Sequence, residues 1–172
     1  MLDTSLINAP IVFLHIPKTA GQTIHNEVTR AVGHSNVSPI RLHSQTSQTK
    51  EQFPVGYRFY SGHLDWVELD RLAKPRFTFS ILRDPRERIA SFYFYILKEA
   101  KTLDQAAREK SENFGKDMIL RVSVDDYFFG GDDAWRSFVS DHYDNFYCRY
   151  FGSQKIRAGN AFSSKPDRGK LR

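Results

Sequence analysis

Phe13-Leu-His-Ile-Pro-Lys-Thr-Ala-Gly-Gln-Thr-Ile24 is the stretch of sequence that decides how this chain folds. A short apolar run leads into it from Ile11, and a helix-compatible stretch follows it. A tight loop between a strand and a helix points backbone N–H groups and the positive end of the helix dipole at one place. Lys18 adds a full positive charge there, and Gly21 lets the backbone approach a ligand closely. The stretch therefore predicts a phosphate-binding loop.

This loop differs from a Walker A motif, G-x-x-x-x-G-K-[ST], which places its lysine after the glycines and a hydroxyl on Mg²⁺. Here Lys18 precedes Gly21, and the Walker spacing does not occur in the chain. Side-chain hydrogen-bond donors are instead expected from Thr19, Gln22 and Thr23. The alternative is an ordinary strand–turn–helix connection that carries a surface lysine.

The stretch Arg76-Phe-Thr-Phe-Ser-Ile-Leu-Arg-Asp-Pro-Arg-Glu-Arg-Ile-Ala-Ser-Phe-Tyr93 repeats this layout. After its apolar, β-prone start, Asp84 suits a helix N-cap and Pro85 suits the first helical position. Arg83 then lies at the carboxyl end of a strand, where open α/β sheets bind ligands. Ser91 follows Asp84 by about two helical turns, so Arg83 and Ser91 could hold one anion. The alternatives are a solvated arginine at a helix start and a small serine that packs within the helix.

At these two stretches the chain resembles a known family. His15-Ile-Pro-Lys-Thr-Ala-Gly-Gln-Thr23 resembles the 5′-phosphosulfate-binding loop of sulfotransferases that use 3′-phosphoadenosine 5′-phosphosulfate (PAPS), and Leu82-Arg-Asp-Pro-Arg-Glu-Arg-Ile-Ala-Ser91 resembles their 3′-phosphate-binding motif. The first motif is most similar to the carbohydrate branch, which includes the heparan sulfate 2-O- and 6-O-sulfotransferases and bacterial relatives. The resemblance covers residues 10–152. It implies an α/β fold, a three-layer, P-loop-like open parallel sheet with flanking helices.

The resemblance also implies how the donor is bound. PAPS would be the donor, no metal ion would be needed, and Lys18 would be catalytic. The cofactor-binding residues would be Pro17, Lys18, Thr19, Ala20, Gly21, Gln22, Thr23, Arg83 and Ser91. None of the six histidines shows the paired spacing that is typical of a metal site.

His63 is the expected catalytic base. Tyr60-Ser-Gly-His-Leu-Asp-Trp-Val-Glu-Leu69 resembles the stretch after the second strand of the 6-O-sulfotransferase group, where a histidine has this proposed role. Sulfuryl transfer to an alcohol requires removal of the hydroxyl proton, and a histidine with a pKa of about 6.5 suits that task at neutral pH. In a loose, in-line transfer, Lys18 would stabilise the leaving phosphate while His63 activates the acceptor on the opposite side. The alternative is a structural histidine packed beside Trp66.

Other residues are expected to line the acceptor cleft or to support the loop. Asp144-Asn-Phe-Tyr-Cys-Arg-Tyr-Phe-Gly152 resembles an asparagine–arginine helix of the family. Asn145 and Arg149 share a helix face and could bind the acceptor, although an ordinary amphipathic helix end is equally compatible. Arg88 is expected to support the loop through a nearby carboxylate. His15 is expected to be structural, because in the family this position supports the loop from beneath.

The alternation of strand-like and helix-like segments predicts a parallel sheet. Strands are expected at 11–16, 57–60 and 76–82. Helices are expected at 21–33, 64–73, 85–101, 102–113 and 134–151, with a helical turn at 124–130 capped by Ser123. Residues 34–54 are expected to form a long loop.

The sequence predicts one domain, 1–152, and a basic flexible tail, 153–172. The tail has six basic residues and one acidic residue, which leaves 19 of each in the body, so the net charge of +5 lies in the tail. A neutral body argues against a nucleic-acid-binding domain. Family members continue past the asparagine–arginine helix with a strand, helices and a basic closing loop. Because no strand is predicted at 153–172, the chain is expected to lack this C-terminal part of the fold.

The location of the protein is weakly constrained. Cys148 is the only cysteine, so an intrachain disulfide is excluded. Neither a leader peptide nor a membrane span is predicted. We therefore expect a bacterial cytoplasmic enzyme. Because animal members of the family are Golgi proteins, the resemblance implies the Golgi lumen if the chain is instead a trimmed eukaryotic enzyme.

The sequence thus predicts a PAPS-dependent sulfotransferase that acts on a hydroxyl of a carbohydrate. The alternative is a non-catalytic or truncated relative that binds a nucleotide or another anion. A kinase using ATP and Mg²⁺ is disfavoured, because the Walker lysine–hydroxyl pair and an evident Mg²⁺ carboxylate are missing. Sugar, lipid-linked glycan and small alcohol all remain open as acceptors, whose cleft residues 34–54 and 102–133 are expected to shape.

Overall fold

The computed structural model describes residues 9–46, 51–110 and 113–157. The chain divides into two compact units, Met1–Arg88 and Ile89–Arg172. Helix α2 (Pro85–Thr102) begins in the first unit and continues in the second. Each unit is described by itself.

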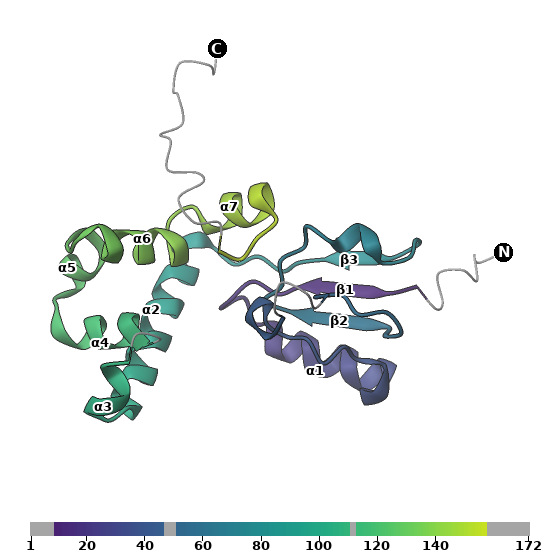
Figure 1. The fold of residues 1–172 in the computed structure, drawn as a ribbon, viewed down its shortest axis with the longest axis horizontal. Coiled ribbons are helices and arrows are strands. Elements are labelled where there is room, and N and C mark those ends of the chain that lie inside the picture. Colours follow the sequence, from purple (N-terminus) through teal and green to yellow (C-terminus); the bar gives the residue numbers. More distant parts are fainter. Residues whose placement is uncertain (1–8, 47–50, 111–112, 158–172) are drawn as a thin grey trace, which may run out of the picture. The chain divides into compact units, whose positions relative to one another are not determined.

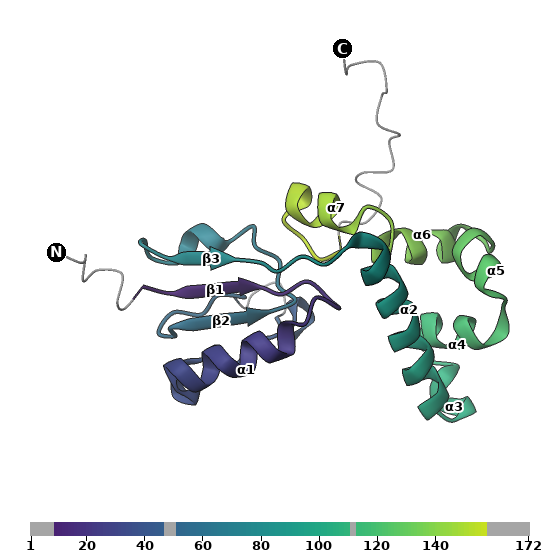
Figure 2. The same ribbon diagram turned by 180° about the vertical axis from the view of Figure 1, so that it is seen from behind.

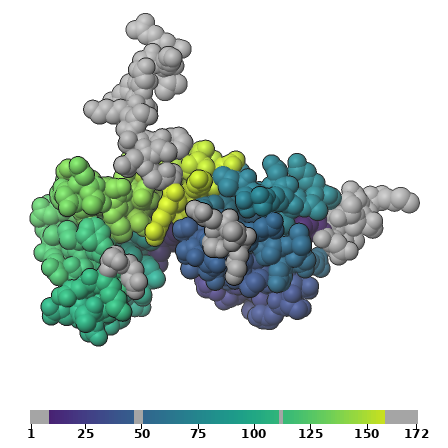
Figure 3. Space-filling view, viewed as in Figure 1, coloured from purple at the N-terminus to yellow at the C-terminus, as the bar shows by residue number. Residues whose placement is uncertain are grey.

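The first unit is built on a parallel sheet of three strands, β1 (Ile11–Leu14), β2 (Phe59–Gly62) and β3 (Phe77–Phe79), in the order β2-β1-β3 (Figure 1). The central strand pairs with both neighbours, and Ile11 lies opposite Phe59 and Phe77. Three of its four residues are buried, and its dark purple surface shows only in small areas of the space-filling view (Figure 3). The predicted α/β class, an open parallel sheet with flanking helices, is confirmed.

Helix α1 (Gly21–Val32) follows β1 and runs beside the sheet (Figure 2). The ring of His25 stacks on Phe59 of β2, with ring centroids 5.7 Å apart. The helix ends at Gly33, whose φ of 87° lies in a region that glycine adopts without steric cost. The predicted strand at 11–16 and helix at 21–33 are therefore found with slightly shorter bounds.

The prediction of a long loop at 34–54 is partly wrong. Short 3₁₀ turns occur at η2 (His34–Asn36) and η3 (His43–Gln45). Between them the chain runs parallel to β2, with single-residue bridges from Val37 to Phe59 and from Leu42 to His63. The polar residues on either side, His34–Asn36 and His43–Gln45, concealed this short pairing segment. Residues 47–50 lie outside the described residues.

The predicted helix at 64–73 is also wrong. Only a 3₁₀ turn, η4 (Leu69–Arg71), forms there. The predicted strand at 76–82 is shortened to β3, but Ser80 continues its contact with β1 by donating a hydrogen bond from Oγ to the Leu14 carbonyl, 2.7 Å away. A side-chain bond thus replaces the backbone ladder beyond Phe79.

The second unit is helical. After α2 come α3 (Gln105–Arg108), α4 (Phe114–Arg121), α5 (Val124–Phe129), α6 (Asp133–His142) and α7 (Phe146–Ser153). Side-chain oxygens of Asp104, Ser123 and Asp132 accept backbone N–H bonds at the starts of α3, α5 and α6. The predicted Ser123 cap is therefore confirmed. Of the helix expected at 102–113, only the short helix α3 is found, and residues 111–112 lie outside the described part.

The single helix predicted at 134–151 is wrong, because α6 ends at His142 and a separate helix, α7, begins at Phe146. Asn145 adopts a left-handed conformation with φ of 45°, which asparagine tolerates better than most residues. The periodic aromatic pattern continues through the break, so the hydrophobic pattern alone did not reveal it. Of the expected tail at 153–172, residues 158–172 lie outside the described residues.

Aromatic rings form the core of the second unit. Trp135 is 1% exposed and stacks edge-on against Tyr127, with ring centroids 4.8 Å apart. Its indole Nε1 donates a hydrogen bond to the Tyr127 carbonyl at 2.8 Å. The hydroxyls of Tyr127 and Tyr143 lie 3.0 Å apart, and burial raises the pKa of Tyr127 to about 12. Every buried polar atom of this trio therefore has a partner.

No helix in the described ranges is both long enough and apolar enough to cross a membrane.

Trp135→Phe is expected to lower the free energy of unfolding by about 1–3 kcal/mol through the lost hydrogen bond, plus a cavity cost. Trp66→Phe is the matched control, because the buried Nε1 of Trp66 has no hydrogen-bond partner among the described residues. Urea unfolding followed by circular dichroism compares the two variants. An equal or larger loss in Trp66→Phe would contradict the importance of the Trp135–Tyr127 bond.

Candidate functional site

The loop after β1 has an unusual backbone. Lys18 and Ala20 both lie in the left-handed region, with φ of 71° and 63°. Such a conformation costs a non-glycine residue about 1–2 kcal/mol, so the loop must be held by its surroundings. Alternating left-handed residues also turn successive N–H groups toward one concavity, which is a common anion site. The loop leads directly into the N-terminus of α1, where backbone N–H groups and the helix dipole favour an anion.

Two side chains of the loop are engaged within the first unit. Thr19 is 2% exposed, and its Oγ1 donates to the Ile16 carbonyl at 2.9 Å. Gln22 donates from Nε2 to Asn26 Oδ1 one turn along α1, at 2.8 Å. In this arrangement the backbone N–H groups, rather than these two side chains, are the donors best placed for a ligand. Thr23 is exposed in the first turn of the helix.

His15 supports the loop from below, because Gly21 packs directly on its ring. A Cβ at Gly21 would lie 1.9 Å from His15 Cδ2, far inside van der Waals contact. The same ring stacks on Phe13, with centroids 5.3 Å apart. Burial lowers the pKa of His15 to about 3, and the charges of His63 and Arg41 add to the effect. His15 is therefore a neutral, packed residue, and only glycine fits above it.

Arg88 holds the loop from the first turn of α2. Its side chain is 2% exposed, and Nε donates to the Pro17 carbonyl at 3.2 Å. The expected supporting role thus involves a direct bond to the loop backbone. The carboxylate of Asp84 accepts the N–H groups of Arg86 and Glu87, which confirms Asp84 as the cap of α2. These bonds lower the pKa of Asp84, the bond from Glu87 most of all.

His63 follows β2 directly and is fixed in one orientation. Its Nδ1 lies 2.7 Å from the carbonyl of His15, and a carbonyl can only accept, so Nδ1 carries the proton. In the neutral ring Nε2 is then an acceptor, as a general base requires. Burial lowers the pKa of His63, while the bond to His15 opposes this shift. The ring is consequently neutral at physiological pH.

Arg83 lies in the link between β3 and α2. Its Nε pairs with Glu87 Oε2 at 3.0 Å, one helical turn away, and 41% of its side chain is exposed. An exposed pair of this kind contributes little to stability.

The topology brings three of the sequence-predicted residues to one edge. Lys18, His63 and Arg83 follow the carboxyl ends of β1, β2 and β3, three adjacent parallel strands of the first unit. The carboxyl edge of such a sheet is where ligands bind. Ser91 lies on α2 in the second unit, so its proposed share in the same phosphate site stays a prediction.

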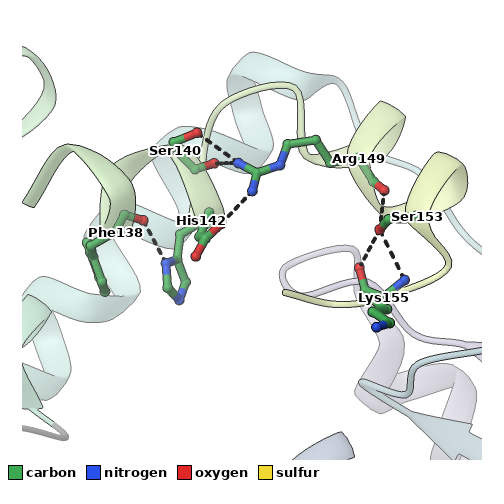
Figure 4. A network of polar contacts seen from close by, with 7 residues as sticks. Phe138, Ser140, His142, Arg149, Ser153 and Lys155 are labelled. Carbon is green, nitrogen blue, oxygen red and sulfur yellow. Dashed lines mark hydrogen bonds and ion pairs between the residues drawn. The ribbon is translucent and has the colours of Figure 1, made fainter. Parts of the chain in front are cut away.

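Asn145 and Arg149 also belong to the second unit, and Figure 4 shows the contacts of Arg149. Arg149 donates from Nη1 to the carbonyl and to Oγ of Ser140, at 2.5 and 2.8 Å, and pairs with Asp141. These bonds tie α7 to α6 across the break at Asn145. This geometry favours the helix-end interpretation, and an acceptor-binding role for either residue stays a prediction.

In the part of the chain that the structure describes, no group of three or more histidine, cysteine, aspartate or glutamate residues could hold a metal ion. One feature of the site was not predicted from the sequence, the segment at Arg41–His43. It pairs with His63 through a bond from His63 N to Arg41 O at 2.8 Å and one from His43 N to His63 O at 2.9 Å. A segment of three residues is too short for its sequence pattern to predict this pairing.

A protein-family sequence model described as "Sulfotransferase family" matches residues 8–150 of the chain. Comparisons with curated proteins and with solved structures each gave no match.

Gly21→Ala is expected to destabilise the first unit, because its Cβ would overlap the ring of His15. His15→Ala removes that ring, so the double variant should recover part of the loss, with a coupling energy of about 0.5–3 kcal/mol. Urea unfolding of the wild type, both single variants and the double variant measures this coupling. Additive losses would show that the ring does not restrict residue 21.

Acid is expected to destabilise the first unit through His15. Its pKa is about 3 in the folded chain and 6.5 in the reference state, so the unfolded chain binds the proton more tightly. The stabilising contribution is therefore complete above pH 6.5 and is lost as the pH falls toward 3. Melting temperatures measured across this range should fall less steeply for His15→Gln than for the wild type. The exposed His34→Gln is the control, and an unchanged slope in His15→Gln would contradict the assignment.

Proposed function

The chain belongs to the sulfotransferase family, and on this basis we propose that it transfers a sulfuryl group from PAPS to a hydroxyl of a carbohydrate. The observation that supports this proposal best is the shared sheet edge of Lys18, His63 and Arg83. At this edge, Lys18 and Arg83 are two separate cationic groups for the two phosphate ends of one nucleotide, and His63 is a neutral imidazole at the same edge.

The donor would lie along this edge. The N–H groups of residues 17–23 and the charge of Lys18 would bind the 5′-phosphosulfate at the helix N-terminus. Arg83 would bind the 3′-phosphate, with Ser91 as the second donor that the sequence predicts. A 3′-phosphate separates this donor from ATP and AMP, so Arg83 would set the specificity.

The reaction would proceed in line. The acceptor oxygen forms a bond to sulfur, the bond from sulfur to the bridging phosphate oxygen breaks, and adenosine 3′,5′-bisphosphate leaves. Nε2 of His63 takes the hydroxyl proton, which the tautomer fixed by His15 permits. Lys18 and the loop N–H groups stabilise the charge that develops on the leaving phosphate.

The second candidate is a non-catalytic relative that binds a nucleotide or another anion. The strained loop and its three supports (His15, Thr19 and Arg88) would serve that function equally well. The orientation of His63 favours transfer, because binding alone does not require a free imidazole nitrogen. Carbohydrate as the acceptor class rests on the form of the first motif, Pro17–Thr23.

Calorimetry is expected to show that adenosine 3′,5′-bisphosphate binds at least tenfold more tightly than AMP or ATP without Mg²⁺, since a charged hydrogen-bonded contact contributes about 1.5–3 kcal/mol. Arg83→Met should abolish this preference and leave AMP binding unchanged. Arg30→Met, which alters an exposed pair on α1, is the control. Equal affinities for the bisphosphate and AMP in the wild type would reject the 3′-phosphate site.

Substitutions at the two proposed catalytic residues should separate binding from chemistry. His63→Ala is expected to abolish transfer from labelled donor across a panel of carbohydrate acceptors, with donor affinity retained. Lys18→Ala should lower both transfer and donor affinity, because it contacts the leaving phosphate. A His63→Ala enzyme of normal activity would remove the proposed base, and a wild type that binds donor without transfer to any acceptor would favour the second candidate.

A further inference from the structure

Arg41 is built into the backbone that holds His63. Its carbonyl accepts the N–H of His63 at 2.8 Å, and a Cβ at Gly62 would lie 2.1 Å from that carbonyl oxygen. Gln45 fixes the other side of the segment, because its Oε1 accepts the N–H groups of Arg41 and Leu42 at 2.6 and 2.7 Å. The backbone of Arg41 is therefore placed beside the proposed base with little freedom.

The guanidinium of Arg41 is half-buried and has no carboxylate partner among the residues that the structure describes. None of the ion pairs formed by described residues includes it. Its Nη1 donates to Nε2 of His25 at 2.5 Å, and its buried Nε has no hydrogen-bond partner within the described ranges. Burial lowers the pKa of Arg41, as expected for a cation removed from water without a counter-charge.

Three histidines of the described part of the chain lie around this cation. Arg41 lies close enough to His15, His25 and His63 to lower the pKa of each, after the larger effect of burial. His43 and Arg88 also face His63. A desolvated guanidinium among such neighbours is costly unless an anion joins it.

We propose that Arg41 binds the oxygens of the sulfuryl group that is transferred from the donor to the acceptor. The inference rests on the proposed function. The acceptor oxygen attacks sulfur from the side of His63, and the bisphosphate leaves from the side of the Lys18 loop, so the three sulfuryl oxygens lie between the two. Arg41 is held on the His63 side by its backbone. A sulfuryl oxygen would then accept a hydrogen bond from its Nε.

This role is distinct from those of the other cations. Lys18 and Arg83 hold parts of the donor that remain in adenosine 3′,5′-bisphosphate, whereas Arg41 would hold only the group that moves. No proton passes through Arg41, which stays charged throughout. It would orient the sulfuryl group for attack and stabilise the negative charge spread over its oxygens in the transition state.

The test compares two ligands that differ only in the sulfuryl group. Dissociation constants for PAPS and for adenosine 3′,5′-bisphosphate are measured for the wild type and Arg41→Met, together with single-turnover transfer rates. Arg41→Met is expected to weaken PAPS binding or slow transfer by roughly ten- to hundredfold, from one lost charged contact, while bisphosphate affinity changes less than about twofold. Arg41→Gln, which keeps a donor for His25, should show the same selective loss if Arg41→Met folds poorly.

The outcomes separate the inference from its premise. Equal weakening of both ligands would place Arg41 on the leaving phosphate, and unchanged PAPS binding and transfer would make it structural; either result overturns the inference but leaves the proposed function intact. A wild type that binds neither ligand would reject the proposed function and this role together. Arg30→Met is the control for the loss of an arginine elsewhere in the first unit.

Discussion

The site depends on one hydrogen bond, from Nδ1 of His63 to the carbonyl of His15. It joins the carboxyl ends of β2 and β1, so it connects the proposed base to the strand that leads into the proposed phosphate-binding loop. It also fixes the tautomer, because a carbonyl accepts only from a protonated nitrogen. The ring of the same His15 lies under Gly21. His15 thus contacts both the proposed base and the loop, and it lies directly after the central strand β1, where its N–H bonds to the Gly62 carbonyl.

The loop shows how strain is maintained at a binding site. Left-handed backbone at Lys18 and Ala20 is unfavourable for residues with a Cβ, so isolated loops of this sequence would relax. Thr19 fixes the loop from inside, and Arg88 fixes it from α2. These contacts hold the loop in one conformation, so an anion bound by its N–H groups, as we propose, would not need to reorganise it. Preorganisation of this kind is what electrostatic catalysis requires.

Much of this arrangement could be predicted from the sequence. Local patterns placed Lys18, His63 and Arg83 after strands. A short apolar run that is followed by Pro17 or Asp84 is typical of a strand that ends in a turn, and His63 follows a short run of the same kind. Long-range pairing was not accessible: the run Val37–Leu42 is short and contains Pro39, and it is strand-like only through its bridges to Phe59 and His63. The break at Asn145 was missed because aromatic residues continue on both sides of it. A left-handed asparagine leaves no mark on hydrophobic periodicity.

The most direct test of the central claim is a map of amide chemical shifts as adenosine 3′,5′-bisphosphate is added to the isotopically labelled protein. The nucleotide should shift the amides of residues 17–23, His63 and Arg83 together at one affinity, because a single ligand would span the carboxyl edge of the sheet. The side-chain nitrogens of His63 should show protonated Nδ1 and unprotonated Nε2 at neutral pH. Shifts confined to α4, α5 and α6, with residues 17–23 unchanged, would contradict the claim.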